Sequence, residues 1–138
     1  MAQSDIAPSA APPVARLIEA FHRLPGIGPK SAQRLTYHLI RMPQDEAEEF
    51  AGAILGVKER VVLCNTCANI SESAECPICA DLQRDGSRIC VVEEPLDVVA
   101  VERARVFSGK YHVLHGVISP VNGIGPNDLK LRELLERL

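Results

Sequence analysis

Tryptophan is missing from this chain of 138 residues, and aromatic residues of all kinds make up only 4% of it. Because hydrophobic residues still make up 46%, we expect a core of aliphatic side chains, sufficient for one ordinary domain or a few very small ones. No apolar run is long enough to cross a bilayer, so no transmembrane helix is predicted. Residues 1–13 lack the basic start and apolar centre of a targeting peptide, and their alanine, proline and serine content predicts a disordered tail.

A strong charge of either sign is missing as well. The formal net charge of −3, taken alone, argues against a nucleic-acid partner. Yet residues 16–41 hold five basic residues and one acid, whereas residues 45–49 hold four acids and no base. A local basic face in an acidic chain is typical of a small contact surface for phosphate, but a solvated helix face gives the same pattern. Charge alone leaves both interpretations open.

The basic region contains two stretches with apolar residues at helical spacing, one on either side of a turn rich in glycine. Apolar residues recur at helical spacing over residues 14–24, and Pro25 ends that helix. The turn is Leu24-Pro25-Gly26-Ile27-Gly28-Pro29-Lys30-Ser31, and Pro29 suits the first turn of a second helix. The buried side of the second helix is expected to consist of Ala32, Leu35, Leu39 and Ile40.

The chemistry of this turn favours phosphate. Gly26 and Gly28 can adopt backbone angles closed to other residues, and no side chain hinders the approach of an anion there. The N–H groups of the turn and of the second helix can point outward. Lys30 and Arg34 are four residues apart, so they lie on one helical face beside the opening. These four residues are predicted to bind the DNA backbone without reading bases.

Two other interpretations of the turn compete with this one. Lys30-Ser31 resembles the end of a nucleotide-binding P-loop, but Pro29 stands where a glycine is needed and no strand precedes the loop. An ordinary helix–helix turn, with glycine for sharpness alone, is the remaining alternative. The combination of glycines and cations favours DNA over that alternative.

Four of the five cysteines form two close pairs, Cys64-Asn65-Thr66-Cys67 and Cys76-Pro77-Ile78-Cys79, with eight residues between them. Each pair can form a tight knuckle, and four thiolates can then bind one tetrahedral Zn²⁺ at about 2.3 Å. A closed shell of four thiolates predicts a structural metal rather than a catalytic one. Disulfides are disfavoured because no secretory signal is present, and a redox pair is not normally doubled. The fifth cysteine, Cys90, is expected to be a small buried hydrophobe.

The rest of the chain predicts one more helix before the cysteines and a small α/β part after them. A helix that starts near Pro43 should bury Phe50 and Ile54 on its inner face. A polar loop over residues 81–87 leads to Ile89-Cys90-Val91-Val92, which predicts a strand buried on both faces. A helix over residues 95–105 and a strand over residues 111–114 complete a parallel strand–helix–strand unit.

Two further features of this part of the chain are an acid after the first strand and a second glycine segment. Glu93 would lie at the carboxyl end of the first strand, where open α/β sheets place their chemistry and a carboxylate could bind Mg²⁺. Gly123-Ile124-Gly125-Pro126 repeats the turn motif, but Asn127 replaces the cation and no helix is expected before it. The segment is therefore expected to start the last helix. Because a sheet of two parallel strands is not a sensible endpoint, we expect a fragment of a longer protein.

The order of these motifs resembles the RecR family of bacterial recombination mediators, from about residue 14 to the end of the chain. The resemblance is carried by residues 24–34, the four-cysteine segment, Ile89 to Pro95, Ser108 to Leu114 and the second glycine segment. It implies an α+β chain of several modules: a helix-hairpin-helix bundle over residues 14–60, a four-cysteine zinc finger over 61–85 and a partial Toprim domain over 86–138. Lys30 and Arg34 fall where the family's hairpin carries its DNA-contacting cations, and Glu93 falls at the Toprim glutamate.

The resemblance also implies a function. The family binds single- and double-stranded DNA without sequence preference and works with RecO and RecF to load RecA onto gapped DNA. It is not an enzyme, it forms dimers and ring-like tetramers, and it works in the bacterial cytoplasm, at the nucleoid and not at a membrane.

Two other classes of function are weighed against this one. A Mg²⁺-dependent Toprim enzyme that cleaves DNA or transfers nucleotides would use Glu93, but such chemistry usually gathers several carboxylates, and only Glu94 and Asp97 are near. A zinc-stabilised interaction module, whose basic face is incidental, would not bind DNA.

Overall fold

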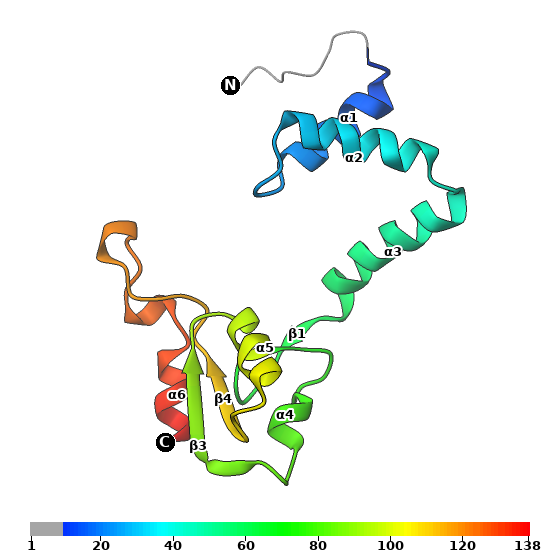
Figure 1. Cartoon of the computed structure of the whole chain (residues 1–138). Helices are drawn as coiled ribbons and strands as arrows, with labels where there is room; N and C mark the ends of the chain where they lie inside the picture. The colour runs from blue at the N-terminus through cyan, green and yellow to red at the C-terminus, as the bar shows by residue number, and fades with distance from the viewer. Residues whose placement is uncertain (1–9) are drawn as a thin grey trace. The chain divides into compact units, whose positions relative to one another are not determined.

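The computed structural model describes residues 10–138 and divides the chain into two compact units, Met1–Leu55 and Gly56–Leu138 (Figure 1). The expected disorder of residues 1–9 lies outside the described residues. Helix α1 (Pro12–His22) begins at Pro12, inside the stretch that was expected to be disordered. A proline in the first helical turn explains this early start, because its missing N–H is not needed there.

In the first unit, α1 packs against α2 (Pro29–Arg41) across the glycine turn. The buried centre of α2 consists of Ala32 and Thr36, and the hydroxyl of Thr36 donates to the carbonyl of Ala32 at 2.8 Å. This hydrogen bond satisfies the polar group, so a threonine can be buried. The expectation that Leu35 and Ile40 are buried was wrong, because the small residues face α1 and these larger ones are exposed.

Helix α3 (Gln44–Arg60) continues across the boundary between the two units. Asp45 and Glu46 occupy its first turn, where acids suit the positive end of the helix dipole. The expected inner face is not covered within the described part of the chain: Phe50 is 47% exposed and Ile54 is 54% exposed. The stripe has helical spacing, but Phe50 and Ile54 on it stay about half exposed among the described residues.

The second unit opens with the cysteine segment. Strands β1 (Val62–Leu63) and β2 (Ile70–Ser71) pair antiparallel, with Leu63 opposite Ile70. The short helix α4 (Pro77–Ala80) follows. These small elements bury little apart from the cysteines themselves, of which Cys64, Cys67 and Cys76 are buried.

Two parallel strands form the sheet of this unit, β3 (Asp85–Val92) and β4 (Gly109–Val113), joined by α5 (Pro95–Ala104). The mixed α+β architecture with parallel strands is therefore confirmed. The β3 strand begins at Asp85, in the expected polar loop, because Asp85 pairs with Gly109 ahead of a register irregularity. It is also not buried on both faces, because Val91 is 44% exposed among the described residues.

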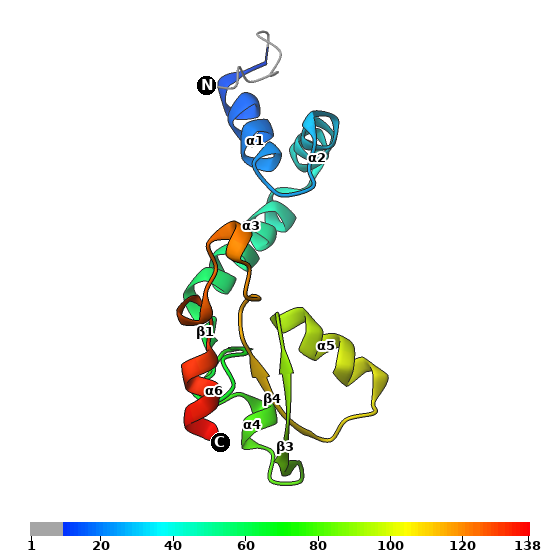
Figure 2. The same ribbon diagram turned by 90° about the vertical axis from the view of Figure 1, so that its left-hand side faces the viewer.

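The core of the sheet consists of Val98 from α5 and Tyr111 and Val113 from β4, with Cys90 packed against it. Two views show α5 and α6 (Leu131–Arg137) on opposite sides of the two strands (Figure 2). The segment between β4 and α6 contains the short 3-10 helices η1 (Pro120–Asn122) and η2 (Pro126–Asp128). Among the described helices, none combines the length and the apolar character needed to cross a membrane.

His112 fixes α6 to the sheet. Its buried ring lies 2.7 Å from the carbonyl of Lys130 through Nε2 and 3.0 Å from the guanidinium of Arg137 through Nδ1. Because a guanidinium only donates, Nδ1 accepts, and Nε2 carries the proton donated to Lys130. Arg137 also donates to the carbonyl of Tyr111 at 2.7 Å. Burial lowers the pKa of His112, so the ring is held neutral.

Candidate nucleic-acid interface and metal centre

The glycine turn between α1 and α2 has a defined backbone. Gly26 has a φ of +78°, which is strained for a residue with a side chain. The N–H of Ile27 donates to the carbonyl of Leu24 at 3.2 Å and closes the turn. Gly28 is extended and forms the N-cap of α2, and Pro29 takes the first helical position. The local sequence therefore fixes both the turn and the start of the helix.

The turn is open to solvent. Among the described residues, a Cβ atom added at Gly26 or Gly28 would meet nothing within 4 Å, and no side chain caps the start of α2. Lys30 and Arg34 are both exposed. The structure thus brings the four residues predicted for DNA together at one helix start, with N–H groups accessible and two cations beside them.

The second glycine segment has the same local conformation, with one difference at the helix start. Gly123 has a φ of +71°, Gly125 is an extended N-cap, and Pro126 takes the first helical position of η2. Here, however, the carboxylate of Asp128 accepts a hydrogen bond from the N–H of Gly125 at 2.8 Å. The position equivalent to Asp128 in the first segment is Ser31, which makes no such bond. In the second segment the carboxylate of Asp128 accepts the N–H of the N-cap glycine, whereas among the described residues no acceptor is seen for the N–H of Gly28 in the first.

The four cysteines of the predicted metal site are gathered within 4.8 Å of one another. The sulfur of Cys64 lies 3.8 Å from that of Cys79, and the sulfur of Cys67 lies 3.6 Å from that of Cys76. A tetrahedral zinc with bonds of about 2.3 Å requires sulfur–sulfur distances of about 3.8 Å. Within the described residues, this is the one cluster of metal-ligating side chains.

Backbone N–H groups point at the sulfurs, as thiolate ligands need. The N–H of Cys76 donates to Cys64 Sγ at 3.3 Å, and the N–H of Asn69 donates to Cys67 Sγ at 3.4 Å. Burial alone would raise the pKa of Cys64, but such N–H donors outweigh it and lower that pKa to about 6. Burial raises the pKa of Cys67 to about 12, and burial and the neighbouring thiols raise that of Cys79 still further. Four thiolates at these distances therefore need a cation between them.

The cysteine segment is fastened to the sheet by polar contacts far apart in the sequence. Lys110 Nζ on β4 donates to three carbonyls at the end of α4, those of Ile78 and Cys79 at 3.0 Å and that of Asp81 at 2.7 Å. Val113 N–H donates to the carbonyl of Cys67 at 2.8 Å. The metal site and the sheet thus form one body, held by contacts of a kind that sequence spacing does not reveal.

Glu93 follows β3 directly, as predicted, and is exposed. One of the two nearby acids, Asp97, serves a structural purpose. The N–H of Glu94 donates to the carboxylate of Asp97 at 2.9 Å, and the N–H of Asp97 donates to the main-chain carbonyl of Glu94 at 3.0 Å. Asp97 is therefore the acid of this group with a side-chain capping role, and no such role is seen for the side chains of Glu93 and Glu94 among the described residues.

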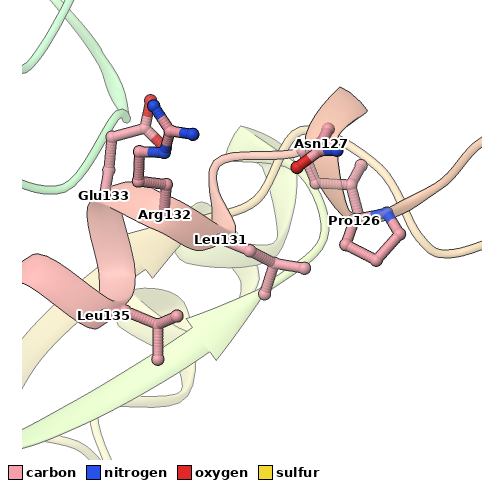
Figure 3. A pocket seen from close by; sticks show the side chains of 7 residues that line it. Pro126, Asn127, Leu131, Arg132, Glu133 and Leu135 are labelled. Atoms are coloured by element: carbon pink, nitrogen blue, oxygen red, sulfur yellow. The ribbon is translucent and has the colours of Figure 1, made fainter.

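A pocket of about 500 Å³ lies between the loop at Pro126 and helix α6 (Figure 3). The figure shows Leu131 facing Pro126, while Arg132 and Glu133 project together from another side of the helix. None of the residues predicted to bind DNA, zinc or Mg²⁺ lines this pocket.

Comparison with known families accounts for most of the chain. Residues 14–57 match the family model described as RecR, helix-hairpin-helix, residues 61–81 match the four-cysteine zinc finger domain of RecR, and residues 87–136 match a Toprim domain. Recombination protein RecR of Herpetosiphon aurantiacus is 56% identical over 126 residues, and that of Bifidobacterium longum is 53% identical over 125 residues. The chain belongs to the RecR family. Both alignments cover 91% of this chain and 62% of the relative, so the chain spans about 62% of the length of these RecR proteins.

The match to the RecR zinc finger domain and the cluster of four cysteines fit one structural zinc ion, as predicted. No other residue type contributes to the ligand set, which is closed. A bound zinc ion would hold the two knuckles together, and the Lys110 hydrogen bonds connect the second knuckle to β4. Sequence reasoning missed Lys110 because its partners are carbonyl groups, which no motif records.

Proposed function

We propose that this chain binds DNA through the helix-hairpin-helix turn, without sequence preference, as a non-catalytic part of a recombination mediator. The observation that carries the proposal is the contrast between the two glycine segments. The segment before α2 leaves its N-cap N–H uncapped and has Lys30 and Arg34 beside it, whereas the segment before η2 is closed by its own Asp128. Backbone N–H groups and flexible cations bind phosphate oxygens and carry no base preference.

The wider role rests on the family. Relatives that are 53% and 56% identical bear the name recombination protein RecR, which supports a role in recombinational DNA repair. We propose that the chain acts with RecO and RecF to load RecA onto gapped or single-stranded DNA in the bacterial cytoplasm, and that it assembles as dimers or ring-like tetramers. Sedimentation of the zinc-loaded protein measures the assembly directly.

The test of DNA binding is a salt series with duplexes of unrelated sequence. Replacement of both Lys30 and Arg34 by alanine is expected to weaken binding to every sequence alike and to flatten the salt slope by about one unit for each cation removed. A matched control removes two exposed cations of the second unit, Arg103 and Arg132. Equal affinity of the hairpin double variant and the unaltered protein would reject the hairpin as the contact site.

The absence of catalysis is part of the proposal. Capping of α5 occupies Asp97, so of the two neighbouring acids only Glu94 is left to act with Glu93, whereas Mg²⁺-dependent phosphoryl chemistry usually employs several carboxylates. DNA cleavage that requires Mg²⁺ and disappears in Glu93→Gln would favour the Toprim enzyme instead.

A further inference from the structure

We propose that the exposed face of α2 is a track for single-stranded DNA on which Tyr37 stacks an unpaired base. The α2 track consists of Lys30, Arg34, Tyr37, His38 and Arg41, and all five are exposed. This inference rests on the proposed function and extends it, because it names a base-contacting residue and a preferred form of DNA beyond the turn itself.

The spacing of these residues places them on one side of the helix. They lie 0, 4, 7, 8 and 11 positions from Lys30 within the 13-residue helix, which is the pattern of a single helical face. The opposite face carries Ala32 and Thr36, both 0% exposed against the first unit. At 1.5 Å per residue the track is about 16 Å long, so contacts with a strand can continue well past the turn.

Tyr37 stands out on this face. It is 51% exposed, and it lies three residues after Arg34 and four before Arg41. The other tyrosine has a clear structural use: Tyr111 is 1% exposed, packs edge-on against Phe107 and donates to the carboxylate of Glu102. Tyr37 makes no side-chain hydrogen bond within the described part of the chain. No polar contact in the fold therefore accounts for a tyrosine at this position.

The chemistry of the track matches an unpaired strand better than a duplex. Cations at both ends of the face can hold successive phosphates, while the ring between them offers a surface to a base. Every base has a π-face, so stacking is tolerant of sequence, as the proposed function requires. In a duplex those faces are covered by neighbouring base pairs, and only the phosphate contacts remain available.

The experiment compares single-stranded and duplex DNA of equal length at one salt concentration, with the full zinc-loaded chain. Tyr37→Leu keeps an apolar side chain on the helix but removes the ring, and it is expected to bind single strands about 5-fold to 150-fold more weakly, the range that one stacked base accounts for. Its duplex affinity should stay within about twofold. Tyr37→Phe keeps the ring and should restore single-strand binding, while Ile40→Ala tests an exposed apolar residue outside the track.

A second readout uses the composition of the chain. With no tryptophan and two tyrosines, of which Tyr111 is buried and out of reach of a base, a change of tyrosine emission on stacking reports on Tyr37. Single-stranded DNA should quench this emission after correction for absorbance, and Tyr37→Phe should lose the change. Unchanged emission in a complex that does form, or equal weakening of both DNA forms by Tyr37→Leu, would overturn the inference. Absence of DNA binding by the unaltered chain would instead overturn the proposed function.

Discussion

Ser31→Asp is expected to stabilise the protein and to weaken DNA binding at the same time. Ser31 holds the third helical position of α2, the place that Asp128 holds in η2. Asp128 Oδ2 lies 2.8 Å from the N–H of Gly125. An aspartate at position 31 can reach the N–H of Gly28 in the same way, because the two backbones share their conformation.

The two effects have separate magnitudes. A carboxylate at a helix start adds about 0.3–1 kcal/mol to the free energy of unfolding. The same carboxylate takes the place of a phosphate oxygen, and the loss of one charge-assisted hydrogen bond weakens binding by about 1.5–3 kcal/mol, or roughly 10-fold to 150-fold. The salt slope of binding should fall by about one unit.

Urea unfolding and fluorescence anisotropy with a labelled duplex measure the two effects on one preparation. Ser31→Asn is the neutral control, and it should affect DNA affinity far less. Asp128→Ser is the converse control, expected to lower the free energy of unfolding by about 0.5–1 kcal/mol and to leave affinity unchanged. An aspartate at position 31 that leaves DNA affinity intact would refute the assignment of the hairpin N–H groups to phosphate.

Three further predictions concern the second unit. Lowering the pH from about 7 to about 5 should reduce the free energy of unfolding of this unit. Burial lowers the pKa of His112 in the folded state, so as the pH falls the unfolded chain binds a proton at this residue first, near pH 6.5. In His112→Asn the urea midpoint should depend less on pH in this range. Lys110→Met should lower the free energy of unfolding by about 1–3 kcal/mol, seen as an earlier urea midpoint at unchanged slope, since three carbonyls lose their donor. Removal of zinc by a chelator should disorder the cysteine segment and broaden the amide signal of Val113, whose partner is the Cys67 carbonyl; a sharp, unshifted signal would show that the fastening survives without the metal.

Local features of the chain were predictable from sequence because their causes are local. The two cysteine pairs define their own knuckles, and glycine and proline in the hairpin set the φ angles and the helix start within a few residues. The parallel pairing of β3 with β4 followed from the order of strand, helix and strand.

Other features depend on contacts that spacing cannot supply. The stripe on α3 showed which side is apolar, but not that Phe50 stays exposed in this chain. Burial of Thr36 depends on its own hydrogen bond to Ala32, which hydrophobic periodicity does not include. The start of β3 at Asp85 depends on pairing with Gly109, far along the chain, and a polar stretch with glycine resembles a turn.

The contact between hairpin N–H groups and DNA is tested most directly by amide chemical shifts of the labelled protein during titration with a duplex of arbitrary sequence. The two glycine segments provide an internal comparison within one spectrum. The signals of Gly26 and Gly28 should move and saturate with the DNA, while those of Gly123 and Gly125 stay in place. Saturable DNA binding with a stationary Gly28 signal would contradict the account.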